Sequence, residues 1–135
     1  TGVSRTVLSM FRRTNADPVI RQFILRTAVL NYLGKSLREQ YNEYCLLRTQ
    51  HENIRLKTAS DQELEDLPTL SELFEMQQLK TAATHRLLMR EYQELLAYMM
   101  DKSDLWDSQE YFKAKSALGA AIHNLRVCAP TKPMD

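Results

Sequence analysis

Glycine, proline and cysteine are scarce in this sequence of 135 residues, which has three Gly, four Pro and two Cys. So few glycines and prolines exclude a collagen-like, linker-rich or low-complexity chain. The two cysteines, Cys45 and Cys128, lie far apart, which excludes a disulfide-dense scaffold and favours a reducing compartment with both thiols free. No apolar run approaches the ~18 residues that a transmembrane helix requires, so we expect no membrane span.

What the sequence does contain fits one folded domain. Hydrophobic residues make up 44% and charged residues 26%, which is ordinary for a folded soluble protein. The length lies within the usual ~100–150 residues of a domain. We therefore expect a single domain over 1–135, with a basic N-terminal segment at 1–16, an acidic connector at 58–68 and a tail at 129–135.

Helix signals open the long first part of the chain. Asp17-Pro18 places a capping acid before a proline, which is a typical helix start, and an apolar stripe of helical spacing follows, with a helix running to about Lys57. A helix of ~40 residues is ~60 Å long, more than a compact domain of this size spans. We therefore expect it either to project or to break near Gly34 or after Arg48. The stripe consists of Ile20, Phe23, Ile24, Leu30, Leu33, Leu37, Tyr41 and Tyr44.

Two more helices are predicted. Thr69 and Glu72 form a capping box directly after Pro68, so we expect a helix from Thr69 to about Met100. A last helix is expected from Ser103, and prolines after residue 129 end it. The expected apolar faces are Leu87, Leu88, Tyr92, Leu95, Leu96 and Met99 on the first of these, and Phe112, Leu118, Ile122 and Leu125 on the second. The predicted fold is all-α: an antiparallel helical bundle of three long helices plus a short N-terminal helix within 1–16.

Charge is uneven along the chain although the net charge is only +1. Residues 1–57 carry ten Lys or Arg and four Asp or Glu, whereas residues 58–135 carry eight and thirteen. The two halves either complement each other inside the molecule, or the basic half meets an acidic partner. A pervasive basic excess, typical of nucleic-acid proteins, is missing, so nucleic-acid binding is not expected; a subunit of a ribonucleoprotein particle stays as an alternative.

Catalytic and metal-binding motifs are not found in the sequence. His51, His85 and His123 stand singly, without a second histidine three to five residues away. The three glycines are isolated, so no phosphate-binding loop is expected. We therefore predict a non-enzymatic protein with no catalytic residue and no metal, whose histidines lie on the surface or are hydrogen-bonded.

Residues 1–16 contain three Arg and no acid, a composition that resembles a mitochondrial targeting segment. Within it, Val7-Leu8-Ser9-Met10-Phe11-Arg12-Arg13 resembles a degenerate form of the motif of the mitochondrial LYR family, with Met10 and Phe11 in place of Leu and Tyr. The stretch 27–38 is similar to the second helix of a branch of that family linked to ATP synthase assembly.

The resemblance implies a non-enzymatic adaptor or accessory subunit of a mitochondrial complex, on the matrix side. Such proteins bind the acidic acyl carrier protein, whose acyl-phosphopantetheine arm enters the apolar space between the helices. The resemblance gives the protein no cofactor of its own. The partner-binding residues that it implies are Met10, Phe11, Arg12, Arg13, Lys35 and Arg38; the alternative is that Met10 and Phe11 are ordinary core residues.

A second resemblance gives the main alternative function. Residues 80–95 are similar to the helical signature of small proteins bound inside ciliary doublet microtubules. It implies a structural helical protein of a ciliary or cytoskeletal assembly, located in the cytoplasm or cilium rather than in mitochondria.

Overall fold

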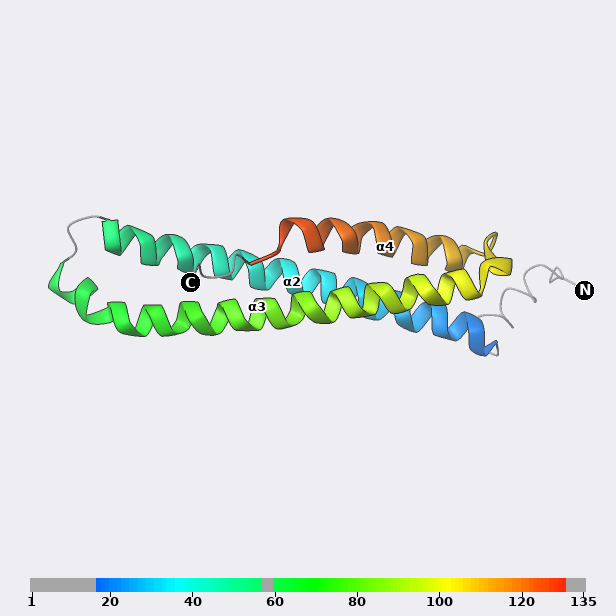
Figure 1. The fold of residues 1–135 in the computed structure, drawn as a ribbon, viewed down its shortest axis with the longest axis horizontal. Coiled ribbons are helices and arrows are strands. Elements are labelled where there is room, and N and C mark those ends of the chain that lie inside the picture. The colour runs from blue at the N-terminus through cyan, green and yellow to red at the C-terminus, as the bar shows by residue number, and fades with distance from the viewer. Residues whose placement is uncertain (1–16, 57–59, 131–135) are drawn as a thin grey trace, which may run out of the picture.

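The computed structural model describes residues 17–56 and 60–130, which form an all-α bundle without a strand in those ranges (Figure 1). Its elements are α2 (Pro18–Leu56), α3 (Asp61–Asp101), the short 3₁₀ helix η1 (Ser103–Leu105) and α4 (Gln109–Val127). α3 runs antiparallel to both α2 and α4, so α2 and α4 point the same way (Figure 1). The predicted all-α bundle of three long helices is confirmed, and the short helix expected within 1–16 lies outside the described residues.

The first helix is continuous and projects beyond the rest of the bundle. The Asp17 carboxylate accepts a hydrogen bond of 2.9 Å from the Val19 N–H, which fits the predicted start. α2 then runs for 39 residues, past Gly34 and Arg48, without the break that was one of the two expectations. At ~1.5 Å per residue it is about 58 Å long, so its last turns extend past the end of α4.

The second helix begins earlier than predicted. Ser60 accepts a hydrogen bond of 3.2 Å from the Glu63 N–H, and the Glu63 carboxylate accepts one of 3.3 Å from the Ser60 N–H. This capping box starts α3 at Asp61, so the acidic stretch expected as a connector at 58–68 is, from Asp61 on, the first turns of a helix, and the expected start at Thr69 is wrong. Pro68 lies inside the helix. The turns before it tilt away from the axis of the rest (Figure 1), as a lost backbone hydrogen bond at proline explains.

The last helix begins later than predicted. The Ser108 hydroxyl accepts a hydrogen bond of 3.1 Å from the Tyr111 N–H and donates one of 2.8 Å to the Leu105 carbonyl. The expected start at Ser103 instead opens η1. Phe112, expected in the core, is 68% exposed, whereas small residues of α4 are buried: Ala114, Ala117 and Ala121.

Burial divides the molecule into two parts along α2 and α3. The proximal half comprises α4, residues 18–44 of α2 and residues 81–101 of α3. The distal hairpin comprises residues 45–56 of α2 and 61–80 of α3. The proximal half contains the buried large aliphatic and aromatic side chains, which are Ile20, Phe23, Leu30, Leu33, Leu37, Tyr44, Leu88, Leu95, Met99, Leu118 and Leu125. No side chain of the distal hairpin is fully buried.

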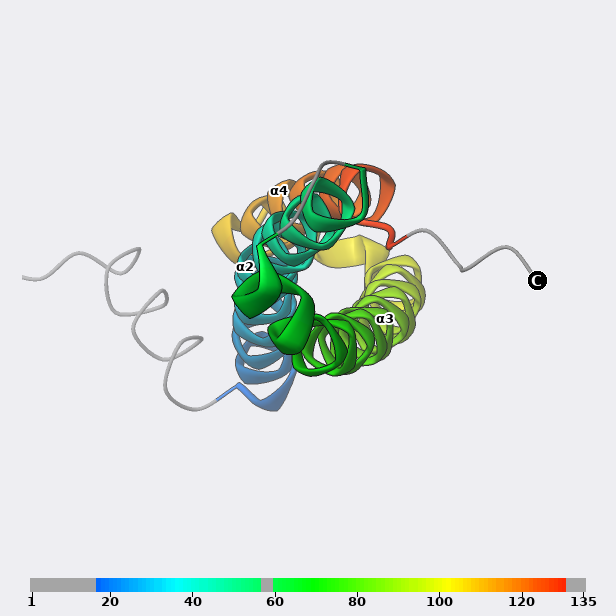
Figure 2. The same cartoon turned by 90° about the vertical axis from the view of Figure 1, so that its left-hand side faces the viewer.

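Aromatic stacking and polar contacts hold the distal hairpin together instead. The Phe74 ring stacks on Tyr44 at 5.3 Å between centroids and on His51 at 5.9 Å. His51 Nε2 also forms a hydrogen bond of 2.9 Å with the Ser71 hydroxyl. Seen end-on in Figure 2, the two helices that make this hairpin, α2 and α3, lie side by side in front of the shorter α4.

Candidate partner-binding groove between α2 and α4

The interface between α2 and α4 is built from small residues, which allows the two helices to approach closely. Ala114, Ala117 and Ala121 are buried on α4. Opposite them on α2, a Cβ atom added to Gly34 would lie 2.9 Å from the Asn124 side-chain nitrogen. The absence of a side chain at position 34 therefore leaves room for the buried amide of Asn124.

Two adjoining hollows open along this interface, of about 300 and 290 Å³, and we call them together the α2–α4 groove. They share Arg38 and Asn124, so they form one continuous depression. The polar side chains that line the groove are Asn31, Lys35, Arg38, Asn42, His123 and Asn124. Amides, cations and an imidazole are all hydrogen-bond donors, so this lining suits an anionic ligand.

Among residues 17–56 and 60–130, no acidic side chain lines either hollow. Lys35 and Arg38 are exposed, and neither forms an ion pair within the described part of the chain. The ion pair between helices in that part is Arg26–Glu94, at 3.5 Å. The acidic residues of 61–75 form no ion pair with a described basic residue, so the groove keeps its positive charge.

Two residues that line the second hollow, Tyr41 and Cys128, have raised pKa values. Burial raises the pKa of the Cys128 thiol, and the positive charge of Arg38 opposes that shift. The pKa of Tyr41 is raised by its interaction with the Cys45 thiol and, to a smaller extent, by burial. The buried Cys128 thiol is therefore a protonated group in the wall of the groove.

The structure brings together two of the six predicted partner-binding residues. Lys35 and Arg38 line the same hollow. Met10, Phe11, Arg12 and Arg13 lie outside the described residues. Sequence reasoning missed Asn31, Asn42, His123 and Asn124, which the fold places beside the two cations. The signal that points to them is Gly34 together with the alanines at steps of three and four on α4, because small residues at this spacing mark a close helix contact.

A further hollow of about 390 Å³ lies at the proximal end of the same interface and shares Asn31 with the groove. Its lining mixes apolar and polar groups, and it includes Phe23, Ile24, Thr27 and Lys113. The Thr27 hydroxyl oxygen is buried and has no hydrogen-bond partner among the described residues. This hollow therefore places apolar walls next to the groove.

The predicted state of the histidines is confirmed. His51 forms a hydrogen bond with the Ser71 hydroxyl, and His85 Nε2 donates a hydrogen bond of 2.9 Å to the Leu125 carbonyl. His123 is exposed. Among the residues that the structure describes, no three His, Cys, Asp or Glu side chains gather where they could hold a metal ion. Nor does any helix there combine the length and apolar character needed to cross a membrane.

Comparisons of the chain with protein-family models, with curated proteins and with solved structures gave no match. The class that fold and site define is thus an all-α bundle that carries a positively charged groove between two parallel helices.

Proposed function

We propose that this protein is a non-enzymatic helical adaptor that binds an acidic partner protein in the α2–α4 groove, as an assembly or accessory subunit of a larger complex. The observation that carries the proposal is the lining of the groove, where no described acidic side chain accompanies Lys35 and Arg38 and neither forms an ion pair among the described residues. Glu39, which follows Arg38 in the sequence, does not line the groove. A folded chain leaves such cations available to carboxylates of a partner, which then steer the encounter.

The partner that the sequence resemblance implies is the acidic mitochondrial acyl carrier protein. Its carboxylates meet Lys35 and Arg38, and Arg12 and Arg13 add charge from the preceding segment. The hollow beside Phe23 and Ile24 supports a role for the acyl-phosphopantetheine arm, because it offers apolar walls next to the cations. The complex is mitochondrial and matrix-facing in this proposal, in line with the Arg-bearing composition of residues 1–16.

The test reverses the charge of the groove and of a matched control surface. Lys35→Glu with Arg38→Glu is compared with Lys80→Glu and Arg86→Glu, which change the net charge equally but lie on the exposed side of α3. Single exposed ion pairs are worth ~0–1 kcal/mol, so the double reversal is needed to see an effect. Calorimetric titration with purified acyl carrier protein measures affinity, and circular dichroism checks that helicity is kept.

We expect the groove variant to lose at least about tenfold in affinity and part of its salt dependence, because charge pairing is replaced by repulsion. Adding Arg12→Glu and Arg13→Glu deepens the loss. The control variant keeps its affinity. Equal binding by both double variants contradicts the groove as the docking site, and no binding of the carrier by the unmodified chain contradicts the carrier as the partner.

The shape of the molecule favours one second candidate, a structural protein of a ciliary or cytoskeletal assembly. α2 and α3, of 39 and 41 residues, form a long rod of the kind that spans several subunits of a filament (Figure 1). Imaging of the full protein with a fluorescent tag separates the two proposals. Signal in mitochondria supports the adaptor, and signal confined to axonemes or cytosol supports the structural protein.

A further inference from the structure

The distal hairpin lacks the third helix that covers the same two helices in the proximal half. α4 ends at Val127, near His85 of α3, whose side chain bonds to the last turn of α4. Beyond this point α2 and α3 have no other described helix to pack on, and their inward apolar side chains are only partly buried: Leu47, Ile54, Leu67, Leu70 and Phe74. Two helices alone leave too much apolar surface in water, so this part of the bundle is incomplete.

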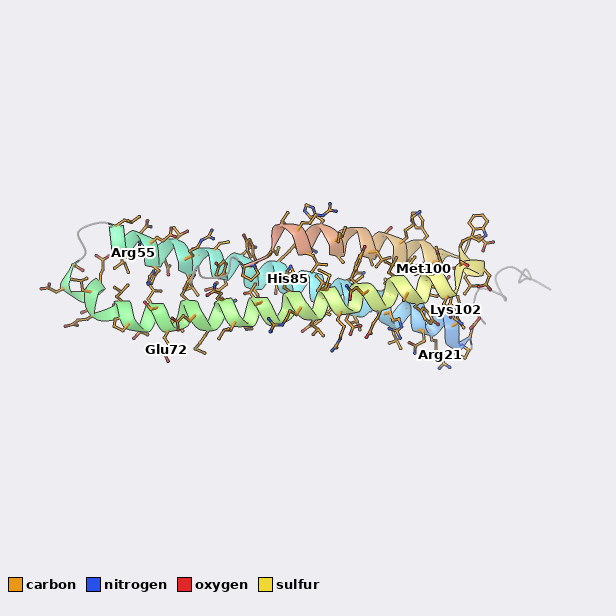
Figure 3. The ribbon with its side chains drawn as sticks, in the orientation of Figure 1. Arg21, Arg55, Glu72, His85, Met100 and Lys102 are labelled. Carbon is orange, nitrogen blue, oxygen red and sulfur yellow. The ribbon has the colours of Figure 1, made fainter. Side chains whose placement is uncertain are left out.

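One exposed face of α3 carries both apolar and acidic side chains in this region. Leu73, Met76 and Leu79 are 49%, 60% and 72% exposed. Glu72 lies four residues before Met76 and seven before Leu79, so the three share a helix face, and Glu65 lies one further heptad back. Figure 3 shows Glu72 pointing away from α2, toward solvent. We call this set of side chains, Asp61, Glu65, Glu72, Leu73, Met76 and Leu79, the outer α3 face.

The face continues toward the proximal half. Ala83 and Leu87 follow Leu79 at steps of four, and Leu87 lines an almost wholly apolar hollow with Val29 and Tyr32 of α2. The stripe from Asp61 to Leu87 is about 39 Å long when measured along the helix at ~1.5 Å per residue, with the bend at Pro68 near its N-terminal end. That is the length of a partner helix of about 25 residues.

The charge of the distal hairpin indicates which kind of partner helix the outer α3 face can bind. The distal hairpin holds seven acidic residues and three basic ones. Within the described residues none of the seven forms an ion pair; the capping box of Glu63 and a hydrogen bond from Gln62 to Asp66 are their polar contacts. An acidic helix is repelled here, whereas a basic one gains charge pairs at the rim of an apolar contact.

We propose that the outer α3 face binds a basic amphipathic helix of a partner protein, whose apolar stripe packs on Leu73, Met76 and Leu79 and whose Lys or Arg side chains face Glu65 and Glu72. The site is separate from the α2–α4 groove and has the opposite charge. The proposal is independent of the groove's own partner. A chain with both sites bridges one acidic and one basic protein.

The test uses three labelled model peptides of about 25 residues, a length set by the stripe on α3. The first has leucines at helical spacing and lysines elsewhere; the second has glutamate for each lysine; the third has the composition of the first in scrambled order. Fluorescence anisotropy follows each peptide during titration with the full chain. We expect the first peptide to bind at least about tenfold more tightly than either of the others, with affinity falling as salt rises.

Two variants locate the site. Leu73→Ser, Met76→Ser and Leu79→Ser together lower the affinity for the first peptide by at least about tenfold. The matched control is Met100→Ser, Trp106→Ser and Phe112→Ser, which removes three similarly exposed apolar side chains from the proximal end and leaves the affinity unchanged. If the distal triple variant does not fold, Glu65→Gln with Glu72→Gln takes its place, with Asp104→Asn and Asp107→Asn as its control.

Three results overturn the proposal. If the scrambled peptide binds as tightly as the first peptide, the interaction is unspecific charge attraction and needs no apolar stripe. Equal binding of the glutamate peptide removes the charge argument. Sedimentation of the chain alone is the third measurement: a dimer that Leu73→Ser, Met76→Ser and Leu79→Ser dissociate identifies a second copy of the chain as the occupant instead.

Discussion

The proximal half and the distal hairpin are made from the same two helices, but only the proximal half has a buried core. On α2 the last buried side chain is Tyr44, and on α3 the first is Thr81. α4 ends close to this level of the bundle. Beyond it both α2 and α3 continue, and their leucines there include exposed ones. The difference shows that in this chain helix continuity and core formation have separate causes. Local backbone hydrogen bonds and caps extend α2 and α3, whereas the main hydrophobic core forms where α4 packs on both of them.

The largest expected effect is on the free energy of unfolding, when the same substitution, Leu to Ala, is made in the proximal half and in the distal hairpin. Leu95 of the proximal half is fully buried and Leu73 of the distal hairpin is 49% exposed. Leu95→Ala leaves a cavity and should lower the free energy of unfolding by ~2–5 kcal/mol. Leu73→Ala leaves none and should change it little. Urea denaturation followed by circular dichroism measures both, and similar losses for the two variants contradict the division into two parts.

Hydrogen exchange should show the same boundary without a substitution. We expect amides of residues 61–80 to exchange at least about tenfold faster than those of 88–99, because a segment without buried side chains opens locally at lower free energy. Mass spectrometry of the exchanged protein after peptic digestion resolves the two segments. Uniform protection along α3 speaks against a weakly packed hairpin. Protection of 61–80 that rises when a basic amphipathic peptide is added links the hairpin to its proposed partner.

The two helical glycines test how closely α4 approaches α2. At Gly119 a Cβ atom meets no neighbour within 4 Å, so Gly119→Ala should stabilise the protein by ~0.5–1 kcal/mol through helix propensity alone. At Gly34 the added Cβ lies 2.9 Å from the Asn124 amide, which must move. Gly34→Ala should therefore gain less or lose stability. Melting temperatures that rise equally for both variants contradict the close helix contact.

The smallest expected effect concerns the thiol at the end of α4. Burial raises the pKa of Cys128 in the folded protein, so the folded state holds this proton more tightly than the unfolded chain does. The stabilising contribution is present below the unfolded pKa of ~8.5 and is lost as pH rises through the higher folded pKa. The melting temperature should fall less between pH 8 and pH 10 in Cys128→Ala than in the unmodified chain. An equal fall in both contradicts a buried, neutral thiol.

Helix existence was predictable from this sequence, but two of the helix starts were not. Ser60 and Glu63 match the capping-box pattern as well as Thr69 and Glu72 do, and Pro68 favours the second pair. The structure uses the first pair and keeps Pro68 inside the helix. At the last helix, Ser103 and Ser108 present the same ambiguity. Where two cap sequences are equally good, tertiary packing determines which of them starts the helix. That packing cannot be read from a single sequence.

The candidate site was predictable in part for a related reason. The family resemblance implied Lys35 and Arg38, and the fold places both in the groove. Their neighbours on α4 were missed because the predicted apolar face of that helix, which began at Phe112, contained only large side chains and no alanine. The close approach at Gly34 instead buries the small side chains Ala117 and Ala121, and turns Phe112 outward. Helix faces are hard to assign from large apolar residues when the contact is made by alanine.

The positions of the two turns have a consequence for the order of folding. α3 and α4 are joined by the short stretch 102–108 at the proximal end, so their first contacts close only a small loop. α2 and α3 are joined at the distal end, and the hydrogen bond of 3.3 Å from the Tyr98 hydroxyl to the Val19 carbonyl spans 79 residues. Closing so long a loop early is entropically unfavourable. The contact between His51 and Ser71 across the distal turn spans only 20 residues. Contacts beside the two turns should therefore form before the proximal end of α2 docks on α3.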